Sequence, residues 1–349
     1  MTDVIDLRSD TVTRPTRAML DAMASATQGD DARDGDPTVR DLEALAAFRT
    51  GKAAALFLPS GTMANLIAVL VHAPRGSEIV MEAGSHTLVS EVGGLSALAG
   101  TLPRPLPGRR GAMDYDRLRE VIRRPGIGRD RAGTGLIHLE TSHNQAGGAV
   151  LPLAHLAAVR DLADRHGVPV HVDGARLFNA AVALGVEAAA IAQHADSVCF
   201  CLSKGLSAPA GSMLCGREDF IEIARGYRRM LGGGMRQIGA LAAAGIVALE
   251  QMVDRLADDH ATARQLAEGL ASLDPALVDP AAVETNLVRV DVSRSPIDAQ
   301  AWATALASRG IRAGAYGDAR QLRLVTHRHV DPAAIERVLE AVRSLLASH

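Results

Sequence analysis

The sequence predicts an α/β protein whose main sheet is mostly parallel and covered by helices. Short apolar runs with strand character alternate with stretches of helical periodicity through most of the 349 residues. After a long helical stretch the pattern changes to a few strands and helices that suit a second, smaller unit. Ligands bind such sheets beyond the carboxyl ends of the strands, so the chemistry is expected there.

The first part of the chain supplies the elements of the larger unit. A helix is expected after Pro15, and a second one over residues 39–48 ends at Gly51. An apolar run at 53–58, a turn and a helix over 62–71 form a strand, turn and helix unit. The alternation continues with strands at 78–81, 135–140, 168–173, 196–203 and 212–215, and with helices at 115–124 and 153–166.

The last part of the chain begins with a helical stretch from Met235 to about Leu270. Beyond it we expect strands at 286–292 and 321–325, a helix at 299–308 and a final helix. These patterns predict an N-terminal arm (1–15), a large domain (16–240) and a small C-terminal domain (241–349) that begins with a long linking helix.

Composition and charge favour a small molecule as the partner. The formal net charge is -3 and no long basic run occurs, so we expect no nucleic-acid or membrane partner. The N-terminus has no signal-peptide character, and no apolar run is long enough to span a bilayer. Three cysteines, two of them in one apolar run, argue against a disulfide framework. We therefore expect a cytoplasmic protein.

Asp173 and Lys204 stand at the carboxyl ends of two expected strands. A carboxylate near an apolar core is costly unless it has a cationic partner, such as the protonated nitrogen of a pyridinium ring. A partly desolvated lysine amine can form a Schiff base with an aldehyde cofactor. The alternatives are an acid that caps the next helix and a lysine that faces solvent.

The turn PSGTMAN, at residues 59–65, places free backbone amides and two hydroxyls at a helix N-terminus. Such a position favours a phosphate, although an ordinary capping turn is equally common. Together with Asp173 and Lys204, the turn would supply the anchors that pyridoxal 5'-phosphate (PLP) requires for its phosphate, ring nitrogen and imine carbon.

Seven segments that span nearly the whole chain carry a further pattern: IDLRSDTVTRPT, LPSGTMANLIA, SHNQAGG, HVDGARLFNA, CLSKGLSAPAGS, RRMLGGGMRQIG and RLVTH. In this order they resemble the low-specificity L-threonine aldolases. The resemblance implies fold type I of the PLP-dependent enzymes, with a mostly parallel sheet of the seven-stranded type and a smaller C-terminal α+β domain. It also implies cleavage of L-threonine, L-allo-threonine and related β-hydroxy-α-amino acids to glycine and an aldehyde.

The resemblance assigns cofactor roles to residues already singled out. Lys204 is implied to hold the cofactor covalently, and Asp173 is implied to face its ring nitrogen. Ser60, Gly61 and Thr62 are implied to form the phosphate cup.

Five further residues receive roles in the same way. His86 is implied to lie over the cofactor ring, and Arg176 beside the phenolic oxygen of the ring or the substrate carboxylate. Ser9 and Arg323, from the two ends of the chain, are the other carboxylate-binding candidates. His143 is implied to lie near the substrate β-hydroxyl. The base stays open between His86, His143 and a bound water.

Other features have two interpretations each. Glu91 is interpreted either as an acid that orients His86 or the cofactor, or as an acid on the surface of a helix. Arg229 and Arg236 flank three glycines. In one interpretation these arginines reach a phosphate of this or a neighbouring subunit, and in the other the glycines form a mobile hinge. The resemblance implies a homotetramer of two dimers with active sites at the subunit interface. No metal-ligand spacing indicates a metal site.

One loop departs from the family pattern. This chain has GDDARDGDPTV where the family commonly has GDDVYGEDPTV, so Arg33 replaces an aromatic residue and is followed by Asp34 and Gly35. The loop is expected near the substrate entrance, where it would affect the preferred aldehyde, the stereochemical choice or a subunit contact. The competing hypotheses are another PLP reaction, such as phenylserine cleavage, β-elimination or transaldol transfer, and a PLP-binding protein without catalysis.

Overall fold

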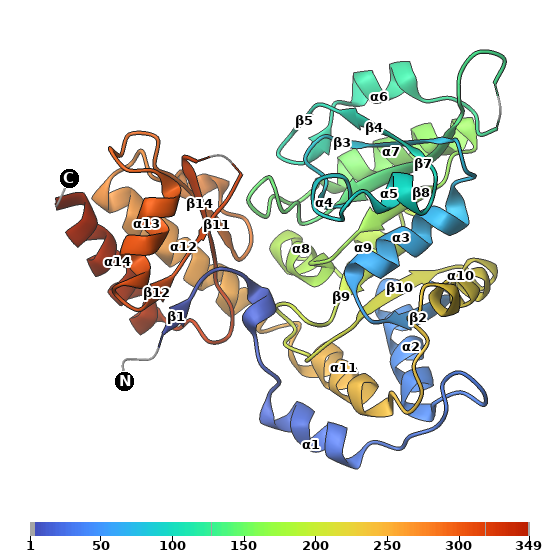
Figure 1. The fold of residues 1–349 in the computed structure, drawn as a ribbon, viewed down its shortest axis with the longest axis horizontal. Coiled ribbons are helices and arrows are strands. Elements are labelled where there is room, and N and C mark those ends of the chain that lie inside the picture. The colour runs from blue at the N-terminus through green and yellow to red at the C-terminus, as the bar shows by residue number, and fades with distance from the viewer. Residues whose placement is uncertain (1–3, 127, 318, 348–349) are drawn as a thin grey trace.

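The computed structural model describes residues 4–126, 128–317 and 319–347. Its core is a sheet of seven strands, and all neighbouring strands run parallel except β10, which is antiparallel to β2 and β9. In spatial order the strands are β2 (Ala54–Leu58), β10 (Ser212–Gly216), β9 (Ser197–Cys201), β8 (Val170–Asp173), β7 (Thr134–Glu140), β3 (Glu78–Glu82) and β4 (Leu102–Leu106). The predicted α/β class with a mostly parallel sheet is confirmed (Figure 1).

Strand β4 was not predicted, because its sequence LPRPL contains two prolines. Proline has no backbone N–H to donate to a neighbouring strand, so it occurs in edge strands. β4 is the last strand of the sheet and pairs only with β3.

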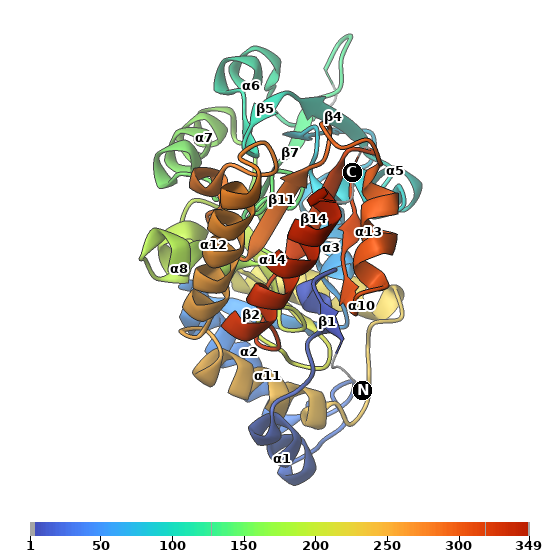
Figure 2. The ribbon, with the colours of Figure 1, turned by 90° about the vertical axis from the view of Figure 1, so that its left-hand side faces the viewer.

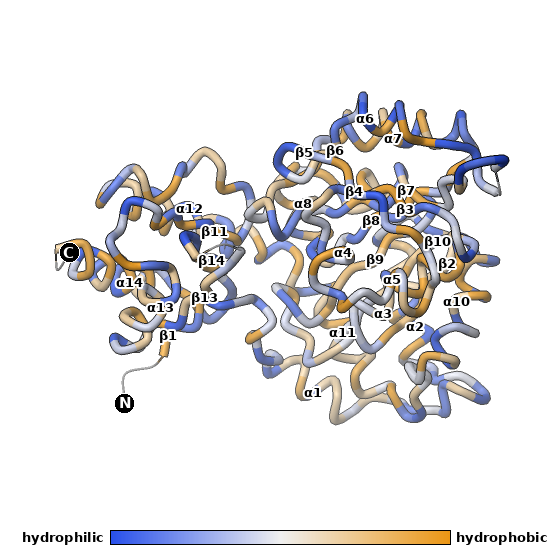
Figure 3. The backbone as a smooth tube through the Cα atoms, turned by 45° about the horizontal axis from the view of Figure 1, so that its top comes forward, coloured by the Kyte–Doolittle hydropathy of each residue, from blue (hydrophilic) through white to orange (hydrophobic). Residues whose placement is uncertain are grey.

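Alternate side chains of the strands pack against helices on the two faces of the sheet. Leu56 and Leu58 belong to one cluster with residues of α3 (Gly61–His72) and α10 (Glu218–Met230). Ala55 and Phe57 belong to a second cluster with residues of other helices. These are α2 (Pro37–Thr50), α6 (Tyr115–Val121), α7 (Leu153–His166), α8 (Leu177–Leu184), α9 (Ala188–Ala192) and α11 (Gly239–Gln251). In Figure 3 the hydrophobic segments lie mainly inside each unit and hydrophilic segments mainly at its periphery.

The C-terminal part of the chain forms a smaller unit with its own apolar cluster (Figures 1 and 2). Its strands are β11 (Leu287–Asp291), β12 (Ile311–Arg312), β13 (Gly314–Ala315) and β14 (Gln321–Val325), and its helices are η2 (Pro280–Ala282), α12 (Leu256–Leu273), α13 (Ala299–Ala307) and α14 (Pro332–Ala347). The N-terminal strand β1 (Ile5–Asp6) pairs with β12, and Ile5 and Leu7 join the same cluster. The first strand and the last helix of the described residues therefore both belong to this unit.

The remaining elements are short and connect or cover the main ones. They are η1 (Asp10–Val12), α1 (Arg17–Ser25), α4 (His86–Val89), α5 (Gly94–Ala97), β5 (Gly108–Arg109) and β6 (Ala112–Met113). Among the residues that the structure describes, no helix combines the length and apolar character needed to cross a membrane.

The prediction of one continuous linking helix is wrong. The stretch from 235 to 270 contains two helices, α11 and α12, separated at residues 252–255. α11 packs on α1 and α2, whereas α12 packs on α8 and α14. The apolar residues continue from α11, which is buried on nearly all sides, into the apolar face of α12, so the sequence gives no sign of the break. The division of the chain into arm, large and small domains stays a proposal.

A buried carboxylate, that of Asp36, ties three segments of the large unit together. Its Oδ1 accepts hydrogen bonds from the backbone amides of Thr38 (3.0 Å) and Val39 (3.3 Å) and so caps α2. Its Oδ2 accepts from the amides of Gly29 (3.0 Å) and Gly239 (2.8 Å), the first residue of α11. Because Asp36 is fully buried, its removal would leave these amides without a hydrogen-bond partner, since water would not reach them.

Asp36→Ala should lower the free energy of unfolding by at least about 3 kcal/mol, the sum expected for a lost cap and buried unsatisfied amides. Asp114→Ala is the matched control, because Asp114 also caps a helix through two backbone amides but is exposed. It should cost only about 1 kcal/mol. Urea unfolding measures both, and equal losses would contradict the linking role of Asp36.

Candidate active site

A cavity of about 430 Å³ opens at the carboxyl ends of the parallel strands. Asp173 ends β8, and Lys204 lies three residues beyond the end of β9. The segment that starts α3 follows β2, and the segment that starts α4 follows β3. The cavity is lined by residues from all four connections, including Ser60, Gly61, Thr62, His86, Glu91, Asp173 and Lys204.

Asp173 is only 1% exposed, and its hydrogen-bond partners are neutral groups. Oδ2 accepts from the Asn65 side chain at 2.8 Å, and Oδ1 accepts from the backbone amide of Ala175 at 3.0 Å. Burial raises the pKa of Asp173. The imidazole of His138 and the ammonium of Lys204 lower this pKa, and the lowering effects outweigh that of burial, so the net shift is downward. Asp173 is therefore an ionised carboxylate that still has room for a cationic partner.

The start of α3 offers an anion site on the same cavity. Ser60 is the N-cap, and its Oγ accepts from the backbone amide of Met63 at 3.2 Å. A Cβ at Gly61 would lie 2.9 Å from Sγ of Cys201, so only glycine fits at this position. The first amides of the helix have no partner within it and attract a negatively charged group.

Lys204 is held by a tight turn. Its carbonyl oxygen accepts from Oγ1 of Thr13 at 2.9 Å and from the backbone amide of Ser207 at 2.8 Å. Ser207 is fully buried and has a φ of 65°, a left-handed conformation that is unusual for serine. The backbone of Lys204 is therefore fixed both by the N-terminal arm and by its own loop.

His86 and Glu91 form a hydrogen-bonded pair at the edge of the cavity. Nδ1 of His86 lies 2.9 Å from Oε1 of Glu91, which is 8% exposed. This hydrogen bond raises the pKa of His86 against the lowering effect of burial. Burial raises the pKa of Glu91, and the hydrogen bond from His86 offsets part of that rise. Because Nδ1 is engaged, Nε2 is the nitrogen left to exchange a proton with a ligand.

A smaller cavity of about 120 Å³ adjoins the first and shares His86, Asp173 and Lys204 with it. The other residues that line it include Ser9, Glu140, Ser142, Asn144, Arg176 and Arg323. The structure thus brings together the three residues expected to bind a carboxylate, Ser9, Arg176 and Arg323.

Arg176 is anchored by a partner that sequence reasoning missed. Its Nε and Nη2 donate to the two carboxylate oxygens of Asp10, each at 2.7 Å, and both residues are buried. Arg323 donates from Nη1 to Oδ1 of Asn144 at 2.8 Å, and it lies over the ring of Tyr316. Nε of Arg323 is buried without a hydrogen-bond partner.

The role expected for His143, near the substrate β-hydroxyl, stays a prediction. His143 is 1% exposed and lines neither cavity. Its Nε2 lies 3.0 Å from Oε2 of the half-buried Glu82 and 3.9 Å from Oε2 of the buried Glu140. Burial lowers the pKa of His143, but these carboxylates raise it more. The cavity is instead reached by Glu140, which accepts from the backbone amide of His86 at 2.6 Å.

Arg229 and Arg236 also do not line either cavity of this chain, and both are exposed. Arg236 lies 3.3 Å from Asp30 instead. The unusual loop with Arg33, Asp34 and Gly35 likewise lines neither cavity.

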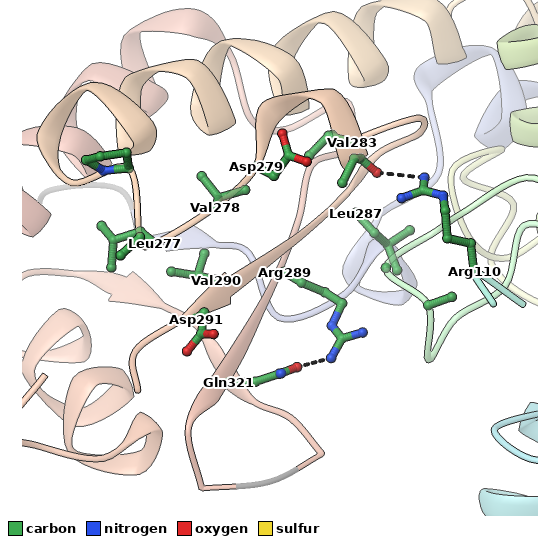
Figure 4. Close-up of a pocket in the computed structure, with 15 residues that line it drawn as sticks. Arg110, Leu277, Val278, Asp279, Val283, Leu287, Arg289, Val290, Asp291 and Gln321 are labelled. Carbon is green, nitrogen blue, oxygen red and sulfur yellow. Dashed lines mark hydrogen bonds between the residues drawn. The ribbon is translucent and has the colours of Figure 1, made fainter. Parts of the chain in front are cut away.

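A larger cavity, of about 540 Å³, lies beside the small unit (Figure 4). Its two guanidinium groups already have partners: Arg110 donates to Glu284 and the carbonyl of Ala282, and Arg289 donates to the carbonyl of Gln145 and to Gln321. None of the groups with cofactor chemistry lines it, so size alone does not identify the site.

The residues around the first cavity fit PLP. Asp173 is a buried carboxylate with neutral donors, the start of α3 is an anion site, and Lys204 is the amine between them. Side-chain atoms of His86, Glu91 and Asp173 also lie within 4.8 Å of one another, a spacing that would suit a metal ion. Their hydrogen bonds to Asn65 and to each other account for this grouping.

Comparisons with known proteins agree with this chemistry. Residues 6–293 match the family described as Beta-eliminating lyase. The chain is 44% identical over 347 residues to the probable low-specificity L-threonine aldolase 2 of Arabidopsis thaliana, covering 99% of this chain and 98% of that protein. It is 42% identical over 345 residues to the low specificity L-threonine aldolase of Escherichia coli K12, covering 99% and 100%.

A solved structure of Leishmania major threonine aldolase shares the fold, with a TM-score of 0.82, 18% identity, and coverage of 98% of this chain and 99% of that one. The predicted fold type I is confirmed, and so is the resemblance found in the seven segments. Relatives with more than two fifths of their residues identical match the chain from end to end. The chain therefore belongs to the family of low-specificity L-threonine aldolases.

Proposed function

We propose that this protein uses PLP to cleave L-threonine, L-allo-threonine and related β-hydroxy-α-amino acids to glycine and an aldehyde, which is acetaldehyde for threonine. The observation that carries the proposal is the convergence of Lys204, Asp173 and the start of α3 on one cavity, beside a second cavity lined by two arginines. The names of the relatives support the same activity.

Three parts of the chain would hold the cofactor. Lys204 would bind its aldehyde carbon, Asp173 its ring nitrogen, and the segment from Ser60 to Thr62 its phosphate. Bound PLP supplies an electron sink for the negative charge that develops on Cα when the Cα–Cβ bond breaks. Asp173 supports that role because an ionised, buried carboxylate favours a protonated ring nitrogen.

The smaller cavity would hold the substrate carboxylate. Arg323 has an unpartnered Nε, and Arg176 is held in place by Asp10. A guanidinium matches a carboxylate with parallel charge-assisted hydrogen bonds, and Ser9 adds a hydroxyl. This grip would orient the amino acid so that the bond to Cβ, rather than the bond to hydrogen, is the one that breaks.

His86 is our choice for the base that takes the proton of the β-hydroxyl. It lines both cavities, and Glu91 orients its ring so that Nε2 is available. His143 is buried behind Glu140 and does not line either cavity, which argues against a direct role. We propose that His143, together with Glu82, holds the side chain of Glu140 in position on the side away from the cavity.

A second candidate function is β-elimination, because the matching family is described as Beta-eliminating lyase. Both reactions require the same cofactor anchors. They differ in which bond at Cα of the substrate breaks, the bond to Cβ in aldol cleavage or the bond to hydrogen in elimination. The products distinguish them, since elimination gives ammonia and a 2-oxo acid, which is 2-oxobutanoate for threonine, whereas aldol cleavage gives glycine and an aldehyde.

We also propose a cytoplasmic homotetramer built from two dimers. Cys199, Cys201 and Cys215 are all free and buried, which suits a reducing compartment. Arg229 and Arg236 are exposed and would be available to the phosphate site of a neighbouring subunit. A fully active monomer in light scattering would contradict the assembly.

Incubation of the PLP-loaded protein with L-threonine should yield glycine and acetaldehyde in equal amounts, together with a visible absorbance band from the bound cofactor. Lys204→Ala should lose both the band and the products, because the amine that binds the cofactor is absent. 2-Oxobutanoate and ammonia in place of glycine and acetaldehyde would establish elimination instead. A band without any of these products would defeat the proposed substrates.

His86→Asn should lower kcat by about a hundredfold or more, whereas His143→Asn should lower it by less than about tenfold, since only a positioned base acts directly. The value of kcat/KM should rise as the pH increases through the pKa of His86, because the unprotonated ring is required. Glu91→Gln should move this rise to lower pH, since the carboxylate that raises the pKa of His86 is removed. Equal losses from the two histidine variants would refute the assignment.

A further inference from the structure

A chain of buried polar side chains leads from the cofactor cavity into the space between α3 and the sheet. Asn65 lines the cavity, and behind it His171, Ser197 and His72 follow one another through hydrogen bonds. Asn65 is 2% exposed, and His171 and Ser197 are fully buried. Polar groups so far from water are stable only if donors and acceptors are matched.

The direction of the hydrogen bonds follows from the surroundings of Asn65. Its Nδ2 lies 2.8 Å from Oδ2 of Asp173 and 2.9 Å from Oε1 of Glu91. Two carboxylates need donors, so both amide hydrogens are used and the amide cannot be turned over. The oxygen Oδ1 of Asn65 must therefore accept hydrogen bonds on its other side.

Sγ of Cys199 donates to that oxygen at 3.2 Å, and His171 supplies a second hydrogen. Its Nε2 lies 3.1 Å from Oδ1 of Asn65 and so carries a proton. Burial lowers the pKa of His171 well below its ordinary value, so the ring is neutral and Nδ1 is an acceptor. Ser197 then donates to Nδ1 at 2.8 Å and accepts from Nε2 of His72 at 2.8 Å. Every hydrogen bond of the chain points toward the two carboxylates.

We propose that Asn65 is a positioning residue that holds Asp173 and Glu91 together as a pair of carboxylates, and that the neutral chain of His171, Ser197 and His72 fixes its orientation. Oε1 of Glu91 also accepts from Nδ1 of His86. One amide therefore links the acid at the ring nitrogen to the acid that orients the base. These two roles rest on the proposed function.

The link is needed because the two acids are close. Side-chain oxygens of Asp173 and Glu91 lie within 4.8 Å of each other. Like charges at this distance in a buried site favour protonation of one of them. The shared amide offsets the repulsion with one hydrogen bond to each acid. Without it, either the ring nitrogen or His86 would lose its ionised partner.

Nitrogen NMR of histidine-labelled protein tests the chain without cofactor or turnover. The signals of His171 are identified by their absence in His171→Gln. We expect a neutral ring with the proton on Nε2 between about pH 5 and pH 8, the range in which an ordinary histidine titrates. A proton on Nδ1 instead, or a charged His171 at neutral pH, would overturn the proposal.

Cofactor binding tests the role of Asn65 itself. Asn65→Ala should weaken PLP binding by about tenfold to a hundredfold, as expected for a lost hydrogen bond to a charged group, yet change binding of 1-deaza-PLP by less than about twofold. The analogue has carbon in place of the ring nitrogen and cannot use the charge of Asp173. Equal weakening for both ligands would mean that Asn65 only supports the fold, and would overturn the proposal.

Two further variants complete the experiment. Asn65→Ser keeps one donor, should weaken PLP binding less, and serves if the alanine variant does not fold. Thr50→Val is the control, because Thr50 is also buried and donates to carbonyl oxygens within its own helix, and it does not line the cofactor cavity. It should bind both ligands like the wild type. Equilibrium dialysis measures binding without turnover, so the outcome stands even if the aldolase assignment fails.

Discussion

The buried carboxylate of Asp173 is the fixed point around which the rest of the site is arranged. An ionised acid that is 1% exposed is costly unless partners compensate it, and its partners within the chain are neutral. Asn65 and the amide of Ala175 hold its position without neutralising its charge. A cationic ring nitrogen would complete the compensation, and Lys204 and the start of α3 line the same cavity as Asp173.

A second buried acid, Asp10, shows the contrast. The guanidinium of Arg176 binds both of its oxygens at 2.7 Å and lowers the pKa of Asp10 below its usual range against the effect of burial. Asp10 is thus compensated by a guanidinium within the chain, whereas the groups that donate hydrogen bonds to Asp173 from Asn65 and Ala175 are neutral. Asp10 also joins the N-terminal arm to the large unit, so the cavity that would hold the substrate carboxylate depends on both ends of the chain.

The sequence predicted those parts of the fold that depend on local patterns. Asp173, Lys204 and the turn before α3 stand at strand ends, and the order of strands and helices is enough to place them at one edge of a sheet. The pairing of Asp10 with Arg176 spans 166 positions and leaves no periodic trace. The contacts of His143 with Glu82 and Glu140 were not predicted, because its motif does not reveal them. Asn65 was overlooked because a polar residue in an apolar helix shows nothing of its partners.

The most direct test of this account is nitrogen NMR of the protein loaded with PLP that carries ¹⁵N at the ring nitrogen. We expect a protonated ring nitrogen at neutral pH in the wild type, because Asp173 is an ionised and buried partner. We expect an unprotonated ring nitrogen in Asp173→Asn, because this change keeps the shape of the side chain and removes its charge. An unprotonated ring nitrogen in the wild type would contradict the central role given to Asp173.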